Sequence, residues 1–370
     1  MKMRTTLFAI LISFVFLFIN GCVDEIKIGI PSNADHLVVD GLITDLPGPY
    51  TVTLSYSNDY FEPFSPNASN YNIRDLVQEA KVSVIDGQGN EEIFEEKSPG
   101  VYQSSADGMR GEVGKSYILK IELENGKKYE SEAEIMPANV GIKDYFIDYT
   151  SKKYLDDGLE KTKDGLNISV IPNEFDGIYE FYRWRWEGTY EILTFPELKI
   201  KYVMGEPVPD PPPCTFEYIP DSENDVRCKC CICWVTEPST SSIVSSKTLG
   251  DSKTLLRFLE NSQGRLLGKY HFYIQQLSIT KEAYEFWNII KQQEDSGSPF
   301  SITNTEVPSN IISVEDKNEK VMGFFSAASV RDIAFYVDRS YLETRPELMD
   351  TVKNDCRVLK YSTNVKPIFW

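Results

Sequence analysis

The sequence predicts a mainly β protein, with a β-sandwich followed by a larger β-rich domain that contains one amphipathic helix. Two observations support this fold class. Short segments that alternate apolar and polar residues recur with turn residues between them, roughly every eight to twelve positions. A single stretch near residue 285 instead repeats its apolar residues at helical spacing. With 370 residues, 41% of them hydrophobic, the chain is long enough for two cores.

The start of the chain predicts a lipoprotein signal peptide at residues 1–21. Lys2 and Arg4 precede an apolar run from Leu7 to Ile19. That run is too short to span a bilayer as a helix, which needs about 20 residues, and its charged flank is typical of an export signal. It ends at Gly21-Cys22, which resembles a bacterial lipobox, so Cys22 is expected to become the acylated first residue. An ordinary cleaved signal with a chance cysteine is the alternative.

Charge and anchoring together predict an outer-membrane location. Asp24 and Glu25 resemble the acidic signal that sends lipoproteins to the cell surface. Residues 22–35 have no periodicity and are expected to form a tether. Each buried methylene of an acyl chain contributes roughly 0.8 kcal/mol, so several chains anchor the protein firmly.

The net charge of −18, without a Lys/Arg-rich run, argues against nucleic acid as a partner.

Residues 36–137 predict the β-sandwich, of immunoglobulin-like or carboxypeptidase-regulatory-like type. Pro47-Gly48-Pro49 supplies turn chemistry between two strand patterns. Asn125-Gly126, between two further patterns, is a strong hairpin signal. The strands expected on either side of these turns are Leu37–Ile43, Tyr50–Tyr56, Lys115–Leu123 and Lys128–Ile135.

The second domain is expected over residues 138–370, and Ile178–Glu187 is its clearest strand. Strand alternation places Tyr182, Trp184 and Trp186 on one face, which we expect to join the core. The opposite face carries Tyr179, Phe181, Arg183 and Arg185. Arginines among aromatic residues suit a contact with a partner, while arginines that extend over a sheet edge are the structural alternative.

The helix is predicted over Thr280–Gln293. Thr280 is a suitable N-cap, and Glu282 complements the helix dipole in the first turn. Ala283, Phe286, Trp287 and Ile290 form one apolar stripe, which we interpret as core packing. Closing strands are expected at Val321–Ser326 and Ile333–Val337.

Residues 205–234 predict a long Pro/Cys-rich loop. Three consecutive prolines at 211–213 favour an extended conformation that cannot join a central strand. Six cysteines follow the expected lipidation site: Cys214, Cys228, Cys230, Cys231, Cys233 and Cys356. Disulfides are the first interpretation for an even number of cysteines in an exported chain, although six cysteines allow fifteen pairings. A structural metal or a redox site is the alternative, but the two interleaved C-x-x-C pairs do not suit a zinc ribbon.

The sequence carries no catalytic constellation that we recognise. Its only histidines are His36 and His271, each interpreted as structural, and the common nucleophile, phosphate-loop and metalloprotease motifs are absent. A catalytic pair of Asp or Glu residues, as in a glycosidase, would leave no sequence pattern, because it depends only on the distance between the two carboxylates in space. We therefore expect no enzyme, no cofactor and no metal. Asp350-Thr351-Val352 resembles a glycosylation sequon, which leaves modification of Thr351 open.

Several stretches resemble the Bacteroidota lipoproteins grouped as domain of unknown function 4249. They are LVVDGLITDLPGPYTVTLS, AKVSVIDGQGN, GKSYILKIELENGKKY, LSITKEAYEFW, VMGFFSAASV and the terminal PIFW, in this order along the chain. The resemblance implies a surface lipoprotein encoded beside TonB-dependent barrel receptors, and it carries over no catalytic residue. A non-enzymatic accessory subunit of such a barrel is the function expected, with direct glycan or peptide binding, and then an unrecognised hydrolase, as alternatives. Because aromatic and arginine side chains dominate interfaces, the candidate contact residues are Tyr179, Phe181, Arg183, Arg185 and Trp234.

Overall fold

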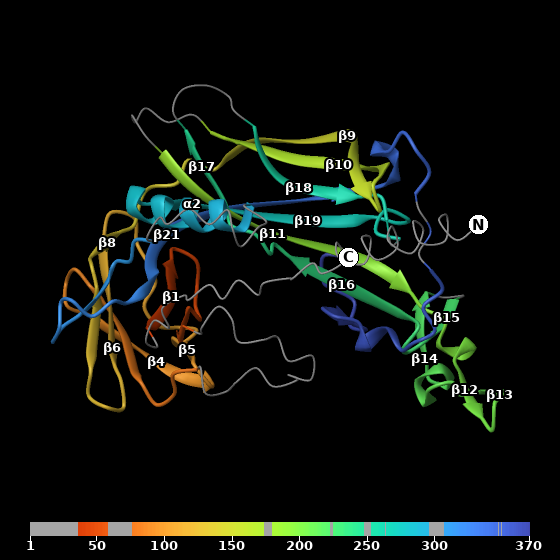
Figure 1. Ribbon diagram of the computed structural model, residues 1–370, viewed down its shortest axis with the longest axis horizontal. Coiled ribbons are helices and arrows are strands. Elements are labelled where there is room, and N and C mark those ends of the chain that lie inside the picture. The colour runs from red at the N-terminus through yellow and green to blue at the C-terminus, as the bar shows by residue number, and fades with distance from the viewer. Residues whose placement is uncertain are drawn as a thin grey trace, which may run out of the picture.

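The computed structural model describes residues 36–57, 76–173, 180–222, 225–247, 253–262, 264–295, 307–346, 348 and 350–370. The predicted signal peptide, Cys22, the tether and Tyr179 lie outside these residues. The described chain is mainly β, and its one α-helix is α2, Lys281–Asp295 (Figure 1). The predicted fold class is thereby confirmed, while the assignment of the first part to a particular sandwich type stays a prediction.

The first core forms from short strands whose apolar residues alternate inward. In β6, for example, Tyr117, Leu119 and Ile121 are buried while the residues between them are partly exposed. Gly126 has a φ of +84° in the tight turn after this strand, a conformation that favours glycine. The strands are β1 (Leu37–Thr44), β2 (Thr51–Tyr56), β3 (Lys81–Asp86), β4 (Glu91–Ser98), β5 (Val101–Gln103), β6 (Ser116–Glu122), β7 (Lys128–Ser131) and β8 (Glu134–Ile135).

The first core also takes in residues from near the end of the chain. Ile311 of β20 (Ile311–Ser313) and Phe325 of β21 (Met322–Val337) belong to the same apolar cluster as β1. β1 pairs in parallel with the first half of β21. The predicted boundary after residue 137 therefore marks where the chain leaves this core, and the core is completed about 180 residues later by a returning segment.

The second core lies between two sheets (Figure 1). One sheet has three strands, β9 (Ile142–Asp156), β10 (Leu159–Pro172) and β18 (Thr254–Glu260), in the order β18-β10-β9. The other continues from β21 through β19 (Tyr270–Ile279) and β11 (Glu180–Leu193) to β16 (Ile232–Pro238), and β17 (Ile243–Lys247) also pairs with β11. Tyr182, Trp184 and Trp186 face this core and are buried, as predicted.

Helix α2 covers part of the outer face of the second sheet. Its Ala283 and Phe286 are buried against Leu277, Phe324 and Val330, so the predicted stripe does pack into a core. Thr280 caps the helix, because its Oγ1 accepts a hydrogen bond from the Ala283 amide at 3.2 Å. The two predicted closing strands are a single strand, β21, which pairs with β1 in its first half and with β19 in its second.

An arm projects from the second domain and is here defined as residues 196–231. It contains two small hairpins, β12 (Ile200–Val203) with β13 (Glu206–Pro209), and β14 (Tyr218–Ser222) with β15 (Asp225–Cys228). A 3₁₀ turn at Pro196–Leu198 leads into the first hairpin, and another at Pro213–Phe216 connects it to the second. Figure 1 shows the β12–β13 hairpin at the far end of the arm. Elsewhere, 3₁₀ turns at Arg339–Tyr341 and Cys356–Val358 lead to the short strand β22 (Ser362–Thr363), which pairs with β16.

Candidate functional site

The five predicted contact residues differ in burial and position in the structure. Trp234 is only 6% exposed, which contradicts its prediction as a surface contact. Phe181 packs against Tyr284 of α2, with ring centroids 4.9 Å apart. Tyr179 lies outside the described residues. Arg183 and Arg185 are brought together in a cleft on the outer face of the second sheet.

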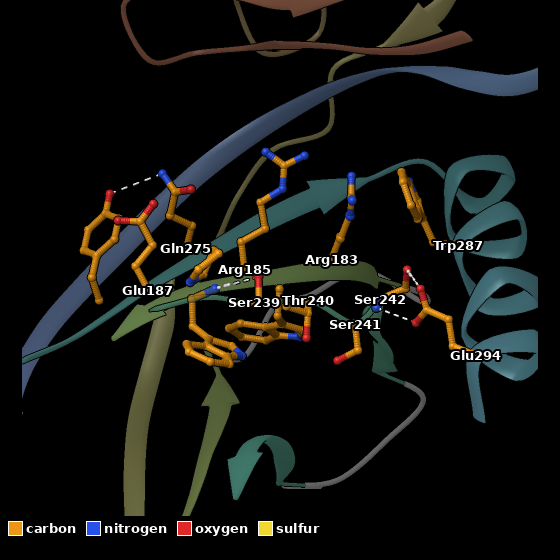
Figure 2. A pocket seen from close by; sticks show the side chains of 14 residues that line it. Arg183, Arg185, Glu187, Ser239, Thr240, Ser241, Ser242, Gln275, Trp287 and Glu294 are labelled. Atoms are coloured by element: carbon orange, nitrogen blue, oxygen red, sulfur yellow. Dashed lines mark hydrogen bonds between the residues drawn. The ribbon is translucent and has the colours of Figure 1, made fainter. Parts of the chain in front are cut away.

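This cleft arises from an interruption in the pairing of β11. β17 pairs with β11 up to Trp184, and β16 pairs with it from Glu187 onward. Between them residues 239–242 leave the sheet, and Ser239 N donates to the Trp186 carbonyl at 2.8 Å. Residues two apart on a strand share a face. Arg183 and Arg185 therefore project from β11 in the same direction at this interruption (Figure 2).

The cavity at this interruption has a volume of about 430 Å³. Its floor is formed by side chains of β11 and the neighbouring β19, and its walls by residues 238–242 and helix α2. Arg183, Arg185, Gln275, Trp287, Thr240 and Ser241 are among its lining residues. Most of the lining residues are polar, and Arg183 and Arg185 supply two positively charged guanidiniums.

Trp287 holds the guanidinium of Arg183. The guanidinium carbon lies 3.3 Å from the centroid of the indole ring, in a cation–π contact. Stacking fixes the plane of a guanidinium and leaves its N–H edges available for hydrogen bonds. The sequence predicted Trp287 as a core residue. It is partly buried against the apolar cluster that contains Ala283 and Phe286, and it also lines the cleft.

Neither arginine forms an ion pair with a carboxylate of the described residues. Burial, and then the adjacent Arg185, lower the pKa of Arg183 to about 9, against the weaker opposing effects of Asp40 and Glu294. Burial also lowers the pKa of Arg185, against the effect of Asp40. Both groups remain cationic at neutral pH. The cleft thus holds two poorly hydrated positive charges side by side.

The other polar groups of the cleft are partly engaged with one another. Glu294 accepts hydrogen bonds from the Ser242 amide at 2.8 Å and from its hydroxyl at 3.2 Å (Figure 2). Gln275 Nε2 donates to the Tyr273 hydroxyl at 3.2 Å. These contacts fix the walls of the cleft. Thr240 and Ser241 are exposed at its rim.

A second cavity of about 310 Å³ adjoins the first and reaches the first core. The two share Arg185 and Gln275 as lining residues, so they lie next to each other. The far wall of the second cavity consists of β1, the start of β2 and the turn between them, and it includes Asp40, Pro47 and Tyr50. No sequence pattern predicted this cleft, because its walls come from segments far apart in the chain.

The arm is the second candidate surface, and the tip of its first hairpin is apolar. Every residue of β12 and β13 is exposed, with Tyr202 at 70% and Met204 fully exposed. Met204 and Gly205 both have positive φ, +53° and +89°, as in a type I′ turn. Lys201 and Asp210 form an ion pair at 2.9 Å across the hairpin.

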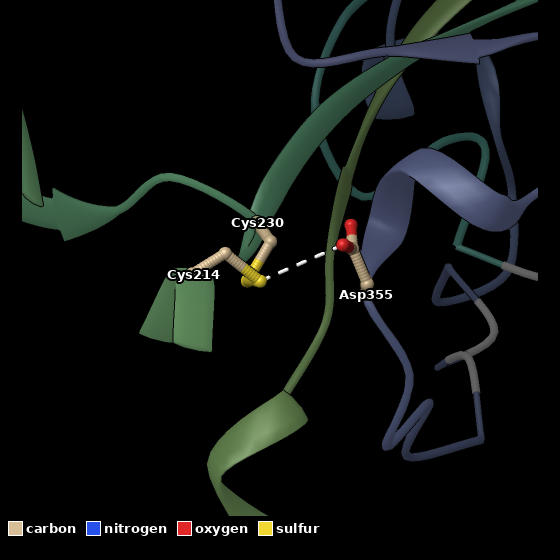
Figure 3. Close-up of side chains that lie close together, drawn as sticks. All are labelled: Cys214, Cys230 and Asp355. Atoms are coloured by element: carbon tan, nitrogen blue, oxygen red, sulfur yellow. Dashed lines mark hydrogen bonds between the residues drawn. A yellow bond between two sulfur atoms is a disulfide. The ribbon is translucent and has the colours of Figure 1, made fainter. Parts of the chain in front are cut away.

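Disulfides join all six downstream cysteines. Cys214–Cys230 and Cys228–Cys231 link residues within the arm, and Cys233–Cys356 ties β16 to the C-terminal segment. Cys214 Sγ also lies 3.5 Å from Asp355 Oδ2 (Figure 3). A disulfide sulfur has neither a proton to donate nor the thiolate charge that metals need. Cys214, Cys230 and Asp355 are the only grouping of metal-ligand type found among the described residues, and in this state the two sulfurs are bonded to each other.

Comparison with known proteins gives a family without an assigned activity. A family model with the description "Domain of unknown function (DUF4249)" matches residues 23–334. No curated protein matches the chain. Among the described residues, no helix has the length and apolar character needed to cross a membrane.

Proposed function

We propose that this chain, which belongs to the DUF4249 family, is a non-enzymatic lipoprotein that serves as accessory subunit of an outer-membrane barrel complex, such as a TonB-dependent transporter. The observation that carries the proposal is the exposed apolar hairpin β12–β13 at the end of the arm. In this proposal the arm is the surface that contacts the barrel, and the lipid on Cys22 keeps the protein at the membrane.

The hairpin is poorly stabilised unless something covers it. Within the described residues β12 and β13 pair only with each other. An isolated two-stranded hairpin is marginally stable in water and usually needs packing on one face. The Cys214–Cys230 and Cys228–Cys231 disulfides restrain the rest of the arm, so the apolar tip is presented on a restrained base. A surface of this kind fits a partner that completes its packing.

The backbone of the hairpin favours a protein partner at one particular edge. Asp210 N donates to the Lys199 carbonyl at 2.8 Å, so the backbone of Asp210 faces β12. Backbone groups of successive residues alternate between the two edges of a strand, so the backbone nitrogens of Pro207 and Pro209 face the outer edge of β13. Prolines supply no N–H there and block strand addition. The outer edge of β12 keeps its backbone groups, and Tyr202 and Met204 are of the types enriched at interfaces.

Lipidation of Cys22 is the first testable part of this proposal. A metabolically incorporated fatty-acid analogue such as alkyne-palmitate should label the wild-type protein and leave Cys22→Ala unlabelled. Both proteins would be expressed in the same Gram-negative host and compared by in-gel fluorescence. Equal labelling of the two proteins would contradict the assignment of the lipidation site.

The contact itself is tested by affinity purification from outer membranes in mild detergent. We expect a barrel protein to co-purify with the wild type and to be lost from Tyr202→Asp/Met204→Asp, because two charges would have to be buried in the contact. A matched control is Leu155→Asp/Leu159→Asp, since these residues are 75% and 66% exposed at the tip of the β9–β10 hairpin.

The control variant should retain the barrel, and all three proteins should have the same melting temperature because the altered side chains are exposed. The proposal is wrong if no barrel co-purifies with the wild type or if the Tyr202/Met204 variant retains it. Flotation of the unlipidated Cys22→Ala protein with liposomes, lost in the Tyr202/Met204 variant, would instead assign the tip to the bilayer.

A further inference from the structure

The cleft around Arg183 and Arg185 is unrelated to the arm and points to a separate activity. Two partly buried guanidiniums lie on one strand face, and within the described residues neither forms an ion pair with a carboxylate, although Asp40 and Glu294 act on them electrostatically. A desolvated cation without a partner costs free energy, which an incoming anion would recover. A pair of such cations therefore suits a negatively charged ligand.

The positions of Arg183 and Arg185 along β11 suit a single anionic group. Residues i and i+2 of a strand are roughly 6.6 Å apart, and both side chains project the same way (Figure 2). A carboxylate between them would accept hydrogen bonds from both, and arginine matches a carboxylate with two parallel bonds. Trp287 already fixes the plane of Arg183, so little conformational entropy would be lost on binding.

The remaining charges of the cleft argue against a polyanion. Glu187 and Glu294 line the first cavity with the arginines, and Asp40 lines the second. A nucleic acid or a heavily sulfated glycan would place further negative charges beside these carboxylates. A ligand with one carboxylate and an otherwise neutral, hydrogen-bonding body avoids that repulsion.

The size and lining of the cleft indicate an organic ligand of several chemical groups. The two neighbouring cavities, of about 430 and 310 Å³, lie within the range of small-molecule sites. Hydroxyls of Thr240 and Ser241 line one end, and Pro47 and Tyr50 line the other. Such walls suit a peptide backbone or a sugar ring equally well.

We propose that this cleft binds the carboxylate of a neutral-bodied organic ligand between Arg183 and Arg185. The C-terminal carboxylate of a short peptide and the carboxylate of a uronic acid in a glycan share this chemistry. The carboxylate lies between the arginines, and the body of the ligand extends past Gln275 toward β1 and β2. The site requires neither the lipid nor the β12–β13 hairpin, so this binding proposal can be tested independently of the accessory function.

The test uses the full mature chain made soluble by Cys22→Ala and four probes in isothermal titration calorimetry. N-acetylated tri-alanine is compared with its amide, and a neutral trisaccharide that ends in a single galacturonic acid is compared with its methyl ester. We expect one of the two acids to bind, and its uncharged counterpart to bind at least tenfold more weakly. Binding of tri-alanine alone assigns a peptide terminus, and binding of the trisaccharide alone assigns an acidic glycan.

Variants separate binding from a structural role. Arg185→Gln should weaken the acid at least tenfold while the melting temperature stays the same or rises, since an unpaired desolvated charge is removed. Arg339→Gln, an exposed arginine outside the cleft, should bind as the wild type does. The proposal is overturned if neither acid binds at about 1 mM, if the amide and ester bind as well as the acids, or if Arg185→Gln binds unchanged.

Discussion

Glu134 has its carboxyl group buried at the junction between the first core and helix α2. It is 5% exposed and accepts hydrogen bonds from Thr280 Oγ1 at 2.9 Å and Asn310 Nδ2 at 3.4 Å. Burial is the main reason that its pKa is raised to about 7, and Glu282 and Glu132 add to the effect, while the two hydrogen bonds oppose it. This residue therefore makes the stability of the junction depend on pH near neutrality.

Replacing Glu134 by glutamine should flatten the dependence of stability on pH. The native state binds the proton of Glu134 more tightly than the unfolded chain, whose glutamate pKa is about 4.5. The contribution is therefore fully present below that value and is lost as pH rises through about 7, by on the order of 3 kcal/mol in all. Urea unfolding at pH 5.5 and 8 should show a larger loss in the wild type than in Glu134→Gln. Every other titratable group is common to both proteins and cancels in the comparison, and parallel losses would contradict the assignment.

Strand alternation was enough to predict which side chains of β11 share a face, but not what covers each of them. Arg183 and Arg185 were correctly placed opposite Trp184 and Trp186 by period-two counting. Trp234 is buried in a strand that pairs with β22, more than 100 residues later, and a local pattern reveals neither fact. The cleft likewise combines side chains from β1, β11, β19 and α2, and only the tertiary fold brings these together.

At the scale of elements, long periodic segments were predictable and the arm was not. The helix and the hairpin around Asn125-Gly126 follow from spacing and turn chemistry alone. The β12–β13 hairpin begins before the predicted loop at 205–234 and continues into it, because prolines on an outer strand edge still permit pairing on the inner edge. The disulfide pairing could not be chosen from the sequence, since it depends on which cysteines the fold places side by side.

The three disulfides should contribute unequally to stability. Cys233–Cys356 closes a separation of 123 residues, whereas Cys228–Cys231 spans only 3. In the chain-entropy description, the longer loop corresponds to about 5 kcal/mol and the shorter to about 2 kcal/mol. We expect Cys233→Ser/Cys356→Ser to lose clearly more unfolding free energy in urea than Cys228→Ser/Cys231→Ser. Equal losses would show that loop closure is not what these bridges contribute.

At the scale of the whole molecule, the two cores are joined by continuous strand pairing. The path of paired strands runs from β2 through β1, β21 and β19 to β11, and β21 contributes to both cores. Gly323 allows the close approach of β1 and β21, because its φ is +96° and a Cβ there would lie 1.9 Å from the Val39 carbonyl oxygen. The sequence suggested two successive domains, since the return of residues 311–327 to the first core leaves no local signature.

This shared strand predicts that the two cores unfold together. All five tryptophans belong to the second part of the chain, so their fluorescence reports that part. Hydrogen exchange of β3 and β6, followed by mass spectrometry, reports the first core. In urea we expect both probes to show the same midpoint. Separate midpoints would mean that the β1–β21 pairing does not couple the cores.

The parallel pairing of β1 with β21 also sets the order in which an exported chain can mature. A chain that crosses a membrane from its amino end delivers β1 first and β21 almost last. Until β21 arrives, one edge of β1 and the apolar surface that Phe325 will cover remain open to water. Contacts so distant in sequence form slowly, and an uncovered apolar strand edge invites association with other chains. If the chain is exported as proposed, its first core therefore stays incomplete and exposed to unwanted association until its last long strand has emerged.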